Sequence, residues 1–404
     1  MGGFSSGSVP SLSNLGFKLR GILMPKLKLM SIVGTRPELI KLSETIKKCD
    51  QYFEHILVHT GQNYDYALNE VFFKEMGIRR PDHYLGVAGD TLGDTIGNVI
   101  SKSYNLMVEQ SPEALLVLGD TNSCLSVISA KRLKIPIFHM EAGNRCFDEN
   151  LPEEVNRRIV DITSDVNLCY SEHARRYLNA SAVPKERTFV VGSPMAEVLN
   201  ANLNSINKST ILDRLHLDPK KYFLLSAHRE ENIDNENAFF SLMNGVNEIA
   251  AKYNLPIIYS MHPRSRKFIK ARKFSFHSKV QAHEPFGFLD YNFLQKNAYC
   301  VISDSGTLAE EAAFFRFPAV SIRTSTERPE AIDKGVFIIG SVKIKKVTQA
   351  INLAVSMVNL TDFPETVQDY VEKNVSGKIV KIIQSYTEII NNDVWKKNCG
   401  YFAS

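Results

Sequence analysis

Short apolar runs alternate with longer amphipathic stretches along most of the chain, over residues 26–359. Runs of this length are typical of buried strands, and the stretches between them are typical of helices. Consecutive parallel strands need a crossover connection, and the crossover helix covers one face of the sheet. The alternation therefore predicts an α/β fold in which parallel sheets carry helices on both faces.

The apolar runs form two series, separated by a polar, Asn-rich stretch at residues 200–209. We expect strands in the first series at residues 27–33, 55–60, 114–118, 135–140, 166–170 and 188–191. We expect strands in the second series at residues 222–226, 256–260, 300–303, 319–322 and 336–339. Helical patterns lie at residues 123–133, 172–179, 235–252, 307–315 and 345–359. Two Rossmann-like lobes with a central cleft follow, at residues 24–195 and 196–380, and ligands of such sheets bind outside the carboxyl ends of the strands.

The length and composition are compatible with two such lobes. The chain has 404 residues, of which 44% are hydrophobic and 23% charged, with a mean hydropathy of −0.15. These values exclude a disordered chain, a collagen and a coiled coil. The net charge of +4 comes from interspersed residues, so it allows an anionic small molecule but predicts no nucleic acid partner. Because no apolar run approaches the length of a membrane span, we expect no membrane segment.

The six cysteines are scattered singly, without a CxxC pair or a Cys/His cluster of zinc spacing. We therefore expect reduced, buried thiols in a cytoplasmic protein, and no metal site. Residues 1–23 are rich in Gly and Ser and lack the apolar core of a signal peptide. We expect them to be a disordered leader outside the fold, ahead of a natural start at Met24.

Several cofactor and catalytic motifs are absent from the sequence. There is no GxGxxG after the first strand, no GxxxxGK[ST] and no GxSxG. The chain therefore lacks the dinucleotide fingerprint, the P-loop and the nucleophile elbow. We expect no cofactor.

The first expected strand leads into Gly34-Thr35-Arg36-Pro37, which begins a helix. Free N–H groups at a helix N-terminus make an anion site, and Pro fits the first turn. Arg36 and Lys41 lie five residues apart, so both side chains could reach a phosphate above this turn. The alternative is an ordinary helix start with two solvated cations.

Three carboxylates follow expected strand or helix boundaries in the first lobe. Asp120 follows the strand at 114–118, and Glu141 follows the strand at 135–140. Glu153 lies in the first turn of a helix that opens at a proline, and Arg157 shares its face. Each acid alone could equally be a helix cap or a salt-bridge partner. Three of them around one cleft favour general acid/base chemistry.

The second lobe contributes a histidine and another anion site. His228 lies at a strand end, flanked by Arg and Glu residues, although a lone His is more often structural. Ser305 and Gly306 precede a helix N-terminus and suit a phosphate, while Glu311 suits the paired hydroxyls of a ribose. A capping box would explain part of this pattern. Arg328 lies in a polar loop and adds a cation.

Two anion sites on facing lobes, with carboxylates between them, describe a nucleotide-sugar cleft. The motifs that carry this description also resemble the non-hydrolysing UDP-N-acetylglucosamine 2-epimerase family, in the order in which that family has them. They are GTRPELIK, GDTNS, MEAGNRCFDENLPEEVNRR, GSP, AHREEN, SDSGTLAEE and TSTERPE. The resemblance extends over residues 24–340.

The resemblance implies a fold of the GT-B or glycogen-phosphorylase type, whose last helices, here residues 381–404, return to the first lobe. It implies a UDP-sugar substrate, no cofactor and a homodimer. Asp120, Glu141 and Glu153 would be the acid/base carboxylates, with His228 as a further catalytic residue. The residues implied to bind the substrate are Arg36, Lys41, Arg157, Ser305, Gly306, Glu311 and Arg328, and His228 would also contact UDP.

Two segments depart from the main pattern of the family. That pattern has EAGLRT followed by Gly, where this chain has EAGNRCFD at residues 141–148, and TGQH, where this chain has TGQN at residues 60–63. Both variants resemble the capsule and O-antigen branch, which converts UDP-2-acetamido-2,6-dideoxy-L-talose to UDP-N-acetyl-L-fucosamine. We expect Cys146 and Phe147 to present an apolar surface to the methyl group of such a sugar, unless Phe147 belongs to the core.

Other activities stay open at this point. Conversion of UDP-N-acetylglucosamine to UDP-N-acetylmannosamine is the first alternative to the 6-deoxy sugar. A GT-B glycosyltransferase would share the fold and the UDP site but would need an acceptor groove. A UDP-sugar-binding regulatory protein would need the anion sites but not the carboxylates.

Overall fold

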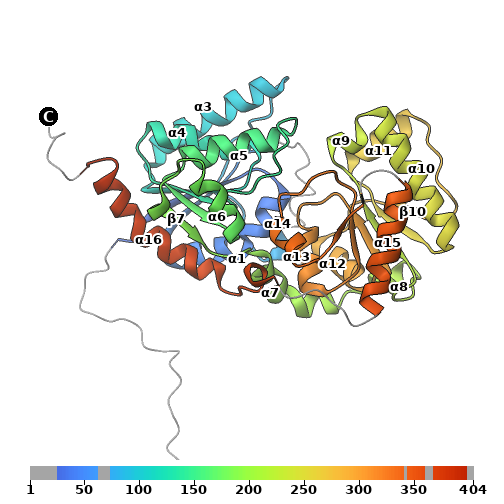
Figure 1. Ribbon diagram of the computed structural model, residues 1–404. Helices are drawn as coiled ribbons and strands as arrows, with labels where there is room; N and C mark the ends of the chain where they lie inside the picture. Colours follow the sequence, from blue (N-terminus) through green and yellow to red (C-terminus); the bar gives the residue numbers. More distant parts are fainter. Residues whose placement is uncertain (1–24, 62–72, 341–343, 360–366, 398–404) are drawn as a thin grey trace, which may run out of the picture.

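The computed structural model describes residues 25–61, 73–340, 344–359 and 367–397, which form two α/β lobes (Figure 1). The first lobe contains a seven-stranded sheet with strand order β3-β2-β1-β4-β5-β6-β7. All of its neighbouring strands are parallel. Its strands are β1 Lys28–Val33, β2 Glu54–His59, β3 His83–Tyr84, β4 Ala114–Leu118, β5 Ile137–Met140, β6 Val166–Cys169 and β7 Thr188–Val190.

The second lobe contains a six-stranded sheet with strand order β10-β9-β8-β11-β12-β13, again parallel throughout. Its strands are β8 Phe223–Ser226, β9 Ile257–Ser260, β10 Val280–His283, β11 Cys300–Ser303, β12 Ala319–Ser321 and β13 Ile338–Ile339. The fold class expected from the alternating pattern is therefore confirmed.

Helices cover both faces of each sheet (Figure 1). The helices of the first lobe are α1 Arg36–Tyr52, α3 Leu92–Gln110, α4 Val127–Arg132, α5 Pro152–Thr163, α6 Glu172–Asn179 and, at the end of the chain, α16 Val375–Asp393. The connection to the second lobe is α7 Met195–Asn207. The remaining helices are α8 Ile211–Arg214, α9 Glu230–Ile233, α10 Glu236–Tyr253, α11 Pro263–Ala271, α12 Phe288–Asn297, α13 Leu308–Phe315, α14 Pro329–Asp333 and α15 Ile344–Asn359.

The central strands are apolar because both faces of each sheet are covered. Every residue of β4 is buried, and its sequence Ala-Leu-Leu-Val-Leu has no alternation. In the first lobe, one core cluster contains Leu29 and Leu116, and the other contains Met30 and Leu115. Successive residues of a strand thus point into opposite layers, as the pleat requires.

In each sheet, the order in which the strands are added reverses direction at the first strand of the lobe, β1 or β8. In the first sheet, β2 lies on one side of β1 and β4 on the other; in the second, β9 and β11 flank β8. Crevices form at the carboxyl ends of strands where the order reverses. Arg36 follows β1 and Asp120 follows β4, while His228 follows β8 and Ser305 follows β11. The predicted site residues therefore lie at the two reversals.

The expected apolar runs all contain strands, but two strands were not predicted. β3 has only two residues, and β10 lies at one edge of its sheet, with no fully buried residue. Both strands lie at sheet edges and lack an apolar run, whereas the edge strands β7 and β13 lie within the apolar runs at 188–191 and 336–339. The helix expected at residues 123–133 begins as a 3-10 turn, Asn122–Ser126, before α4.

The last helix, α16, packs against α1 of the first lobe (Figure 1). It begins at Val375, ahead of the segment 381–404 that we expected to return, and it places Ile379, Ile383 and Ile390 in the core of the first lobe. The expected leader at residues 1–23 lies outside the described residues. In the described ranges, no helix is long and apolar enough to cross a membrane.

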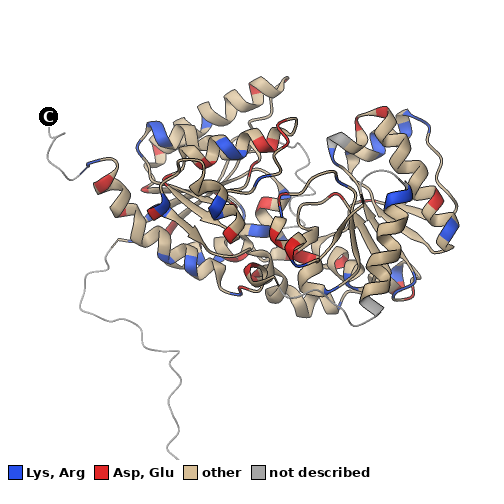
Figure 2. Ribbon diagram, in the orientation of Figure 1, with Lys and Arg blue, Asp and Glu red and all other residues tan. Residues whose placement is uncertain are grey.

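Charged residues are interspersed over the ribbons of both lobes (Figure 2). The five cysteines in the described ranges, namely Cys49, Cys124, Cys146, Cys169 and Cys300, are buried and unpaired, as expected.

Candidate active site

A cavity of about 760 Å³ lies between the two lobes. Its walls come from the carboxyl ends of β1, β4 and β5 on one side and from those of β8, β9 and β11 on the other. All the residues predicted to form the site line it: Arg36, Lys41, Asp120, Glu141, Glu153, Arg157, His228, Ser305, Gly306, Glu311 and Arg328. A volume of this order suits a ligand of nucleotide-sugar size.

Glu141 is the carboxylate that both lobes share. It follows β5 and is 5% exposed. Lys41 Nζ of the first lobe donates to its Oε2 at 2.5 Å, and Arg328 Nη2 of the second lobe donates to its Oε1 at 2.7 Å. Burial alone would raise the pKa of Glu141, but these two cations outweigh burial and lower the pKa to about 2. The carboxylate is therefore ionised at neutral pH.

The backbone at Glu141 is left-handed, with φ +64°. Such a conformation costs a non-Gly residue on the order of 1–3 kcal/mol, and it persists where surrounding contacts fix it. Here the ion pairs with Lys41 and Arg328 and the following Gly143 fix it. Gly143 has φ +79°, and a Cβ there would lie 2.4 Å from the carbonyl oxygen of Ala174. The turn can therefore hold only Gly at that position.

Arg328 is almost completely buried and has partners on both sides of the cavity. Its Nε donates to Glu310 Oε1 at 3.1 Å, in addition to the bond to Glu141. Its guanidinium carbon lies 5.6 Å from the centre of the Tyr170 ring, and the Tyr170 hydroxyl donates to Glu141 Oε2 at 3.2 Å. Neither Tyr170 nor Glu310 was predicted, although Tyr170 ends the apolar run at 166–170.

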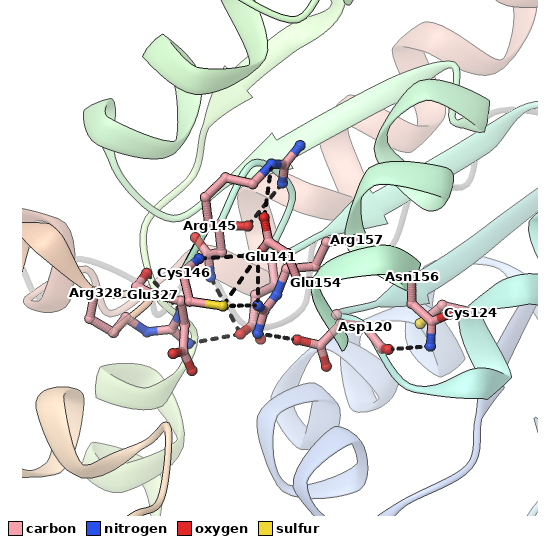
Figure 3. Close-up of polar contacts among 12 residues, drawn as sticks. Asp120, Cys124, Glu141, Arg145, Cys146, Glu154, Asn156, Arg157, Glu327 and Arg328 are labelled. Carbon is pink, nitrogen blue, oxygen red and sulfur yellow. Dashed lines mark hydrogen bonds and ion pairs between the residues drawn. The ribbon is translucent and has the colours of Figure 1, made fainter. Parts of the chain in front are cut away.

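Asp120 and Arg157 form a further ion pair of the cavity (Figure 3). Arg157 Nη2 lies 2.5 Å from Asp120 Oδ2, and Asn156 Nδ2 donates to the carbonyl oxygen of Asp120 at 2.9 Å. The family resemblance implies that Arg157 lies beside Asp120, Glu141 and Glu153. Besides its pair with Asp120, its Nη1 lies 3.3 Å from Glu154 Oε2 and 3.6 Å from Cys146 Sγ. No hydrogen bond or ion pair from the described residues reaches the Glu153 carboxylate, which is therefore the acid most open to a ligand.

A buried polar network connects α5 to the segment that follows β5, next to these residues. It was not predicted. Glu154 is fully buried and accepts from the backbone N–H of Cys146 at 3.1 Å (Figure 3). Arg145 Nη1 pairs with Asp161 at 2.6 Å, and Asp161 also lies 3.0 Å from His139 Nδ1. Buried charges of this kind need partners, so acids on the inner face of α5 are the signal that sequence reasoning could have used.

The start of α1 differs from the expected phosphate turn. The Glu38 carboxylate accepts from the Gly34 N–H at 3.0 Å and from the Ser123 hydroxyl at 2.5 Å. Burial raises the pKa of Glu38 above its ordinary value. This N–H is therefore occupied by the protein's own side chain, and an anion at this position would meet the Arg36 side chain instead.

In the second lobe, a buried carboxylate organises the loop that carries His228. Asp304 accepts from the backbone N–H groups of His228 and Arg229, at 2.9 and 3.0 Å, and it lies 3.1 Å from His228 Nδ1. Burial would raise the pKa of Asp304, but His228 and these donors lower it. The His228 ring stays partly exposed and faces His262, 5.8 Å away, whose pKa is lowered to about 4 chiefly by burial. His262 was not predicted.

Ser305, Gly306 and Glu311 lie together at the start of α13. The Ser305 and Thr307 hydroxyls are 3.0 Å apart, and a Cβ on Gly306 would lie 2.8 Å from Glu327 Oε1. Glu311 accepts from Gln295 Nε2 at 2.5 Å and from the Thr307 hydroxyl at 3.0 Å. Burial raises its pKa to about 7.

Cys146 and Phe147 do not form the expected apolar wall of the sugar pocket. Neither residue lines the cavity. Phe147 is 62% exposed and packs edge-on against Tyr177, while Cys146 is buried with its Sγ 3.4 Å from Glu154. That expectation was wrong because the chain turns sharply at Phe147, where φ is +58°. Gln62 and Asn63, the other departure, lie outside the described residues.

These contacts define what the cavity can do chemically. The first lobe lines it with four carboxylates: Asp120 and Glu141 are paired with cations, Glu38 accepts from Gly34 and Ser123, and Glu153 is open. Carboxylates placed around one cavity can take and return a proton, while Arg and Lys side chains can hold an anion that leaves.

Comparisons with known proteins agree with this description. A family model for UDP-N-acetylglucosamine 2-epimerase matches residues 47–384. The structure of UDP-N-acetylglucosamine 2-epimerase from Rickettsia bellii is 48% identical, with a TM-score of 0.86, covering 92% of this chain and 99% of that one. The enzyme of Methanocaldococcus jannaschii, solved with UDP-GlcNAc and UDP, is 31% identical, with a TM-score of 0.83, covering 89% and 99%. UDP-2,3-diacetamido-2,3-dideoxy-D-glucuronate 2-epimerase of Pseudomonas aeruginosa is 32% identical, covering 78% and 88%.

The raised pKa of Glu311 predicts how stability depends on pH. A carboxyl whose pKa rises on folding stabilises the fold fully below its unfolded pKa, here 4.5, and this stabilisation is lost as pH rises through about 7. Between about pH 4 and pH 8 the wild type should therefore lose on the order of 3 kcal/mol more unfolding free energy than Glu311→Gln, since other titrating groups act equally on both proteins. Urea unfolding at both pH values measures this difference. The exposed Glu248→Gln is the control and should follow the wild type, whereas parallel pH dependence of wild type and Glu311→Gln would contradict the prediction.

Proposed function

Since this chain belongs to the UDP-N-acetylglucosamine 2-epimerase family, we propose that it interconverts UDP-N-acetylglucosamine and UDP-N-acetylmannosamine. The chain is a UDP-sugar 2-epimerase, an isomerase, and its substrate is a UDP-N-acetylhexosamine. The observation that carries the proposal is the carboxylate Glu141, bound by a cation from each lobe at the base of the cavity. The two homologues named as UDP-N-acetylglucosamine 2-epimerases support the choice of sugar.

The proposed reaction proceeds by elimination and re-addition. Carbon 2 of an N-acetylhexosamine has no adjacent carbonyl, so its proton is not acidic enough for simple removal and return. A carboxylate takes the proton from carbon 2, the electron pair forms the bond between carbons 1 and 2, and the bond from carbon 1 to UDP breaks. UDP then adds back to carbon 1 of the glycal as a proton returns to the other face of carbon 2. No electrons are gained or lost, so the reaction needs no redox cofactor.

Each part of the proposed reaction has a candidate in the cavity. We assign the two proton transfers to the carboxylates Asp120, Glu141 and Glu153, because groups at different positions are needed to reach both faces of carbon 2. The leaving diphosphate would be stabilised by Arg36, Lys41 and Arg328. UDP would be held from the second lobe by the residues His228, Ser305, Gly306 and Glu311, with Arg157 near the sugar. A closed cavity keeps the glycal and UDP together.

A second candidate substrate is UDP-2-acetamido-2,6-dideoxy-L-talose, a precursor of capsule and O-antigen sugars. The observation in its favour is Asn144, a departure from the main family pattern, whose Nδ2 lies 3.4 Å from Glu141 Oε1. A changed residue on the reacting carboxylate is a reasonable place for a change of substrate. The Pseudomonas aeruginosa relative is named for yet another UDP-sugar at similar identity, so identity of about a third leaves the sugar open.

We also propose that the chain forms a homodimer through α3 and α5. Exposed apolar residues recur there at helical spacing, namely Tyr104 and Val108 on α3 and Val155, Ile159 and Ile162 on α5. Apolar side chains at i and i+4 lie on one helix face, so they form a stripe that a second copy could cover. Light scattering should give twice the chain mass, and Ile162→Asp should give the mass of one chain. A monomeric wild type would contradict the proposal, and exposed Lys185→Asp on the same lobe is the control.

The assignment of the carboxylates predicts the effect of removing each one. Asp120→Asn, Glu141→Gln and Glu153→Gln should each lower turnover at least about 100-fold, because an amide cannot exchange the proton. Glu149→Gln, on the exposed rim beside α5, is the matched control and should keep wild-type turnover. Thermal unfolding checks that each variant is folded. Near-normal turnover in all three site variants would remove these groups from the mechanism.

The choice of substrate is tested by proton NMR of each UDP-sugar in heavy water, with no acceptor present. We expect loss of the carbon 2 proton signal of UDP-N-acetylglucosamine and formation of UDP-N-acetylmannosamine. Only an epimerase makes a new UDP-sugar under these conditions, so the experiment also excludes a glycosyltransferase and a binding protein. If the carbon 2 proton of the 6-deoxy-L-sugar exchanges at least about tenfold faster than that of UDP-N-acetylglucosamine, the 6-deoxy-L-sugar is the substrate instead.

A further inference from the structure

Tyr170 occupies a position that the proposed reaction has not yet used. It directly follows β6, is completely buried, and is the residue before the N-cap of α6. Its hydroxyl contacts the carboxylate Glu141 of its own lobe, and its ring faces Arg328 of the other lobe. One side chain therefore touches both members of the ion pair that joins the lobes at the cavity.

The phenol contributes a hydrogen bond to Glu141. The Tyr170 hydroxyl lies 3.2 Å from Glu141 Oε2, the oxygen that also accepts a hydrogen bond from Lys41 Nζ. An ionised carboxylate only accepts, so the phenol is the donor. Burial and the nearby negative charge of Glu141 raise the pKa of Tyr170 well above its ordinary value, against the opposing effect of Arg328. The hydroxyl therefore keeps its proton throughout the neutral pH range.

The ring contributes a surface for Arg328. A guanidinium over an aromatic face is attracted by the ring quadrupole, more strongly where water is excluded. Arg328 is 1% exposed, and its Nη2 and Nε are bound to Glu141 and Glu310. The ring thus lies against the guanidinium whose Nη2 donates to Glu141.

Residues that follow Tyr170 connect the start of α6 to α14, the helix that follows Arg328. The Ser171 hydroxyl lies 3.2 Å from Glu330 Oε2, and His173 Nε2 lies 2.7 Å from Asp333 Oδ2. Glu330 and Asp333 belong to α14, which begins directly after Arg328. The start of α6 therefore holds α14 along its length, and Tyr170 lies at the end of this contact nearest the cavity.

We propose that Tyr170 is a positioning residue for the epimerisation, which orients Glu141 through its hydroxyl and Arg328 through its ring when the lobes close. The proposal rests on the proposed function, because Glu141 is taken to exchange the proton and Arg328 to stabilise the diphosphate. The hydroxyl and the ring can be removed separately, so the two parts have separate tests.

Tyr170→Phe removes the hydroxyl and keeps the ring. We expect kcat to fall about tenfold, the effect of one hydrogen bond, with UDP affinity unchanged within about twofold. The charged or polar groups facing Glu141 are Lys41 from α1, Arg328 from before α14 and Asn144, with Arg157 and Glu310 beyond them. Since these stay in place, loss of one donor should raise the pKa of Glu141 and move the acid limb of the kcat/KM profile to higher pH.

Tyr170→Leu also removes the ring. We expect UDP affinity, measured by calorimetry, to fall about tenfold because Arg328 loses one of its supports. This measurement needs no turnover. If the wild type epimerises no UDP-N-acetylhexosamine, the proposed function fails, while the affinity of Tyr170→Leu still decides whether the ring orients Arg328.

Tyr222→Phe is the matched control, since Tyr222 is also buried and its hydroxyl donates to the Leu294 carbonyl oxygen at 2.7 Å in the core of the second lobe. It should lower the unfolding temperature without moving the pH profile or the UDP affinity. A Tyr170→Phe enzyme with wild-type kcat and an unmoved acid limb would overturn the role of the hydroxyl. Unchanged UDP affinity in folded Tyr170→Leu would overturn the role of the ring.

Discussion

The ion pairs of Glu141 with Lys41 and Arg328 are the interaction on which the site depends. Taking three charges out of water is costly, and it is tolerated only where each charge has close partners. Lys41 belongs to the same lobe as Glu141 and Arg328 belongs to the other, so the pair with Arg328 forms only when the lobes are close together. This arrangement of charges depends on local features of the chain. They are the left-handed backbone at Glu141, the glycine two residues later and the buried acids around Arg328. The cavity between the lobes is built around one charge cluster.

Much of the fold could be predicted from sequence because burial on both sides of a parallel sheet leaves long apolar runs. Strands such as β4 and β11 are buried throughout, and their boundaries were close to those expected. β3 and β10 lie at sheet edges, where half of the strand faces solvent, and their sequences carry no such run. The pattern of a sequence reports burial, so elements that bury little are the ones it misses.

Most of the predicted site residues could be found because they follow strands whose carboxyl ends meet at one edge. Asp120 and His228 are of this kind. The hydrogen bonds and ion pairs among the site residues could not be predicted, since they depend on which side chains the folded lobes bring close together. Arg157 shares a helix face with Glu153, but its ion-pair partners are Asp120 and Glu154, and Phe147 turns away from the cavity. Tyr170 was missed because its role appears only through contact with Arg328 across the lobes, and Glu310 was missed because Arg328, its partner, comes from a separate segment of the second lobe.

The position of α16 has a consequence for how the protein is made. Ile379, Ile383 and Ile390 of this helix complete the core of the lobe that contains β1. The ribosome delivers the start of that lobe first and its helix α16 only after the whole of the second lobe. The strands and helices from Ile211 to Asn359 are contiguous, so the second lobe can finish folding during synthesis. The first lobe must wait, with an apolar surface on α1 uncovered, until α16 has left the ribosome.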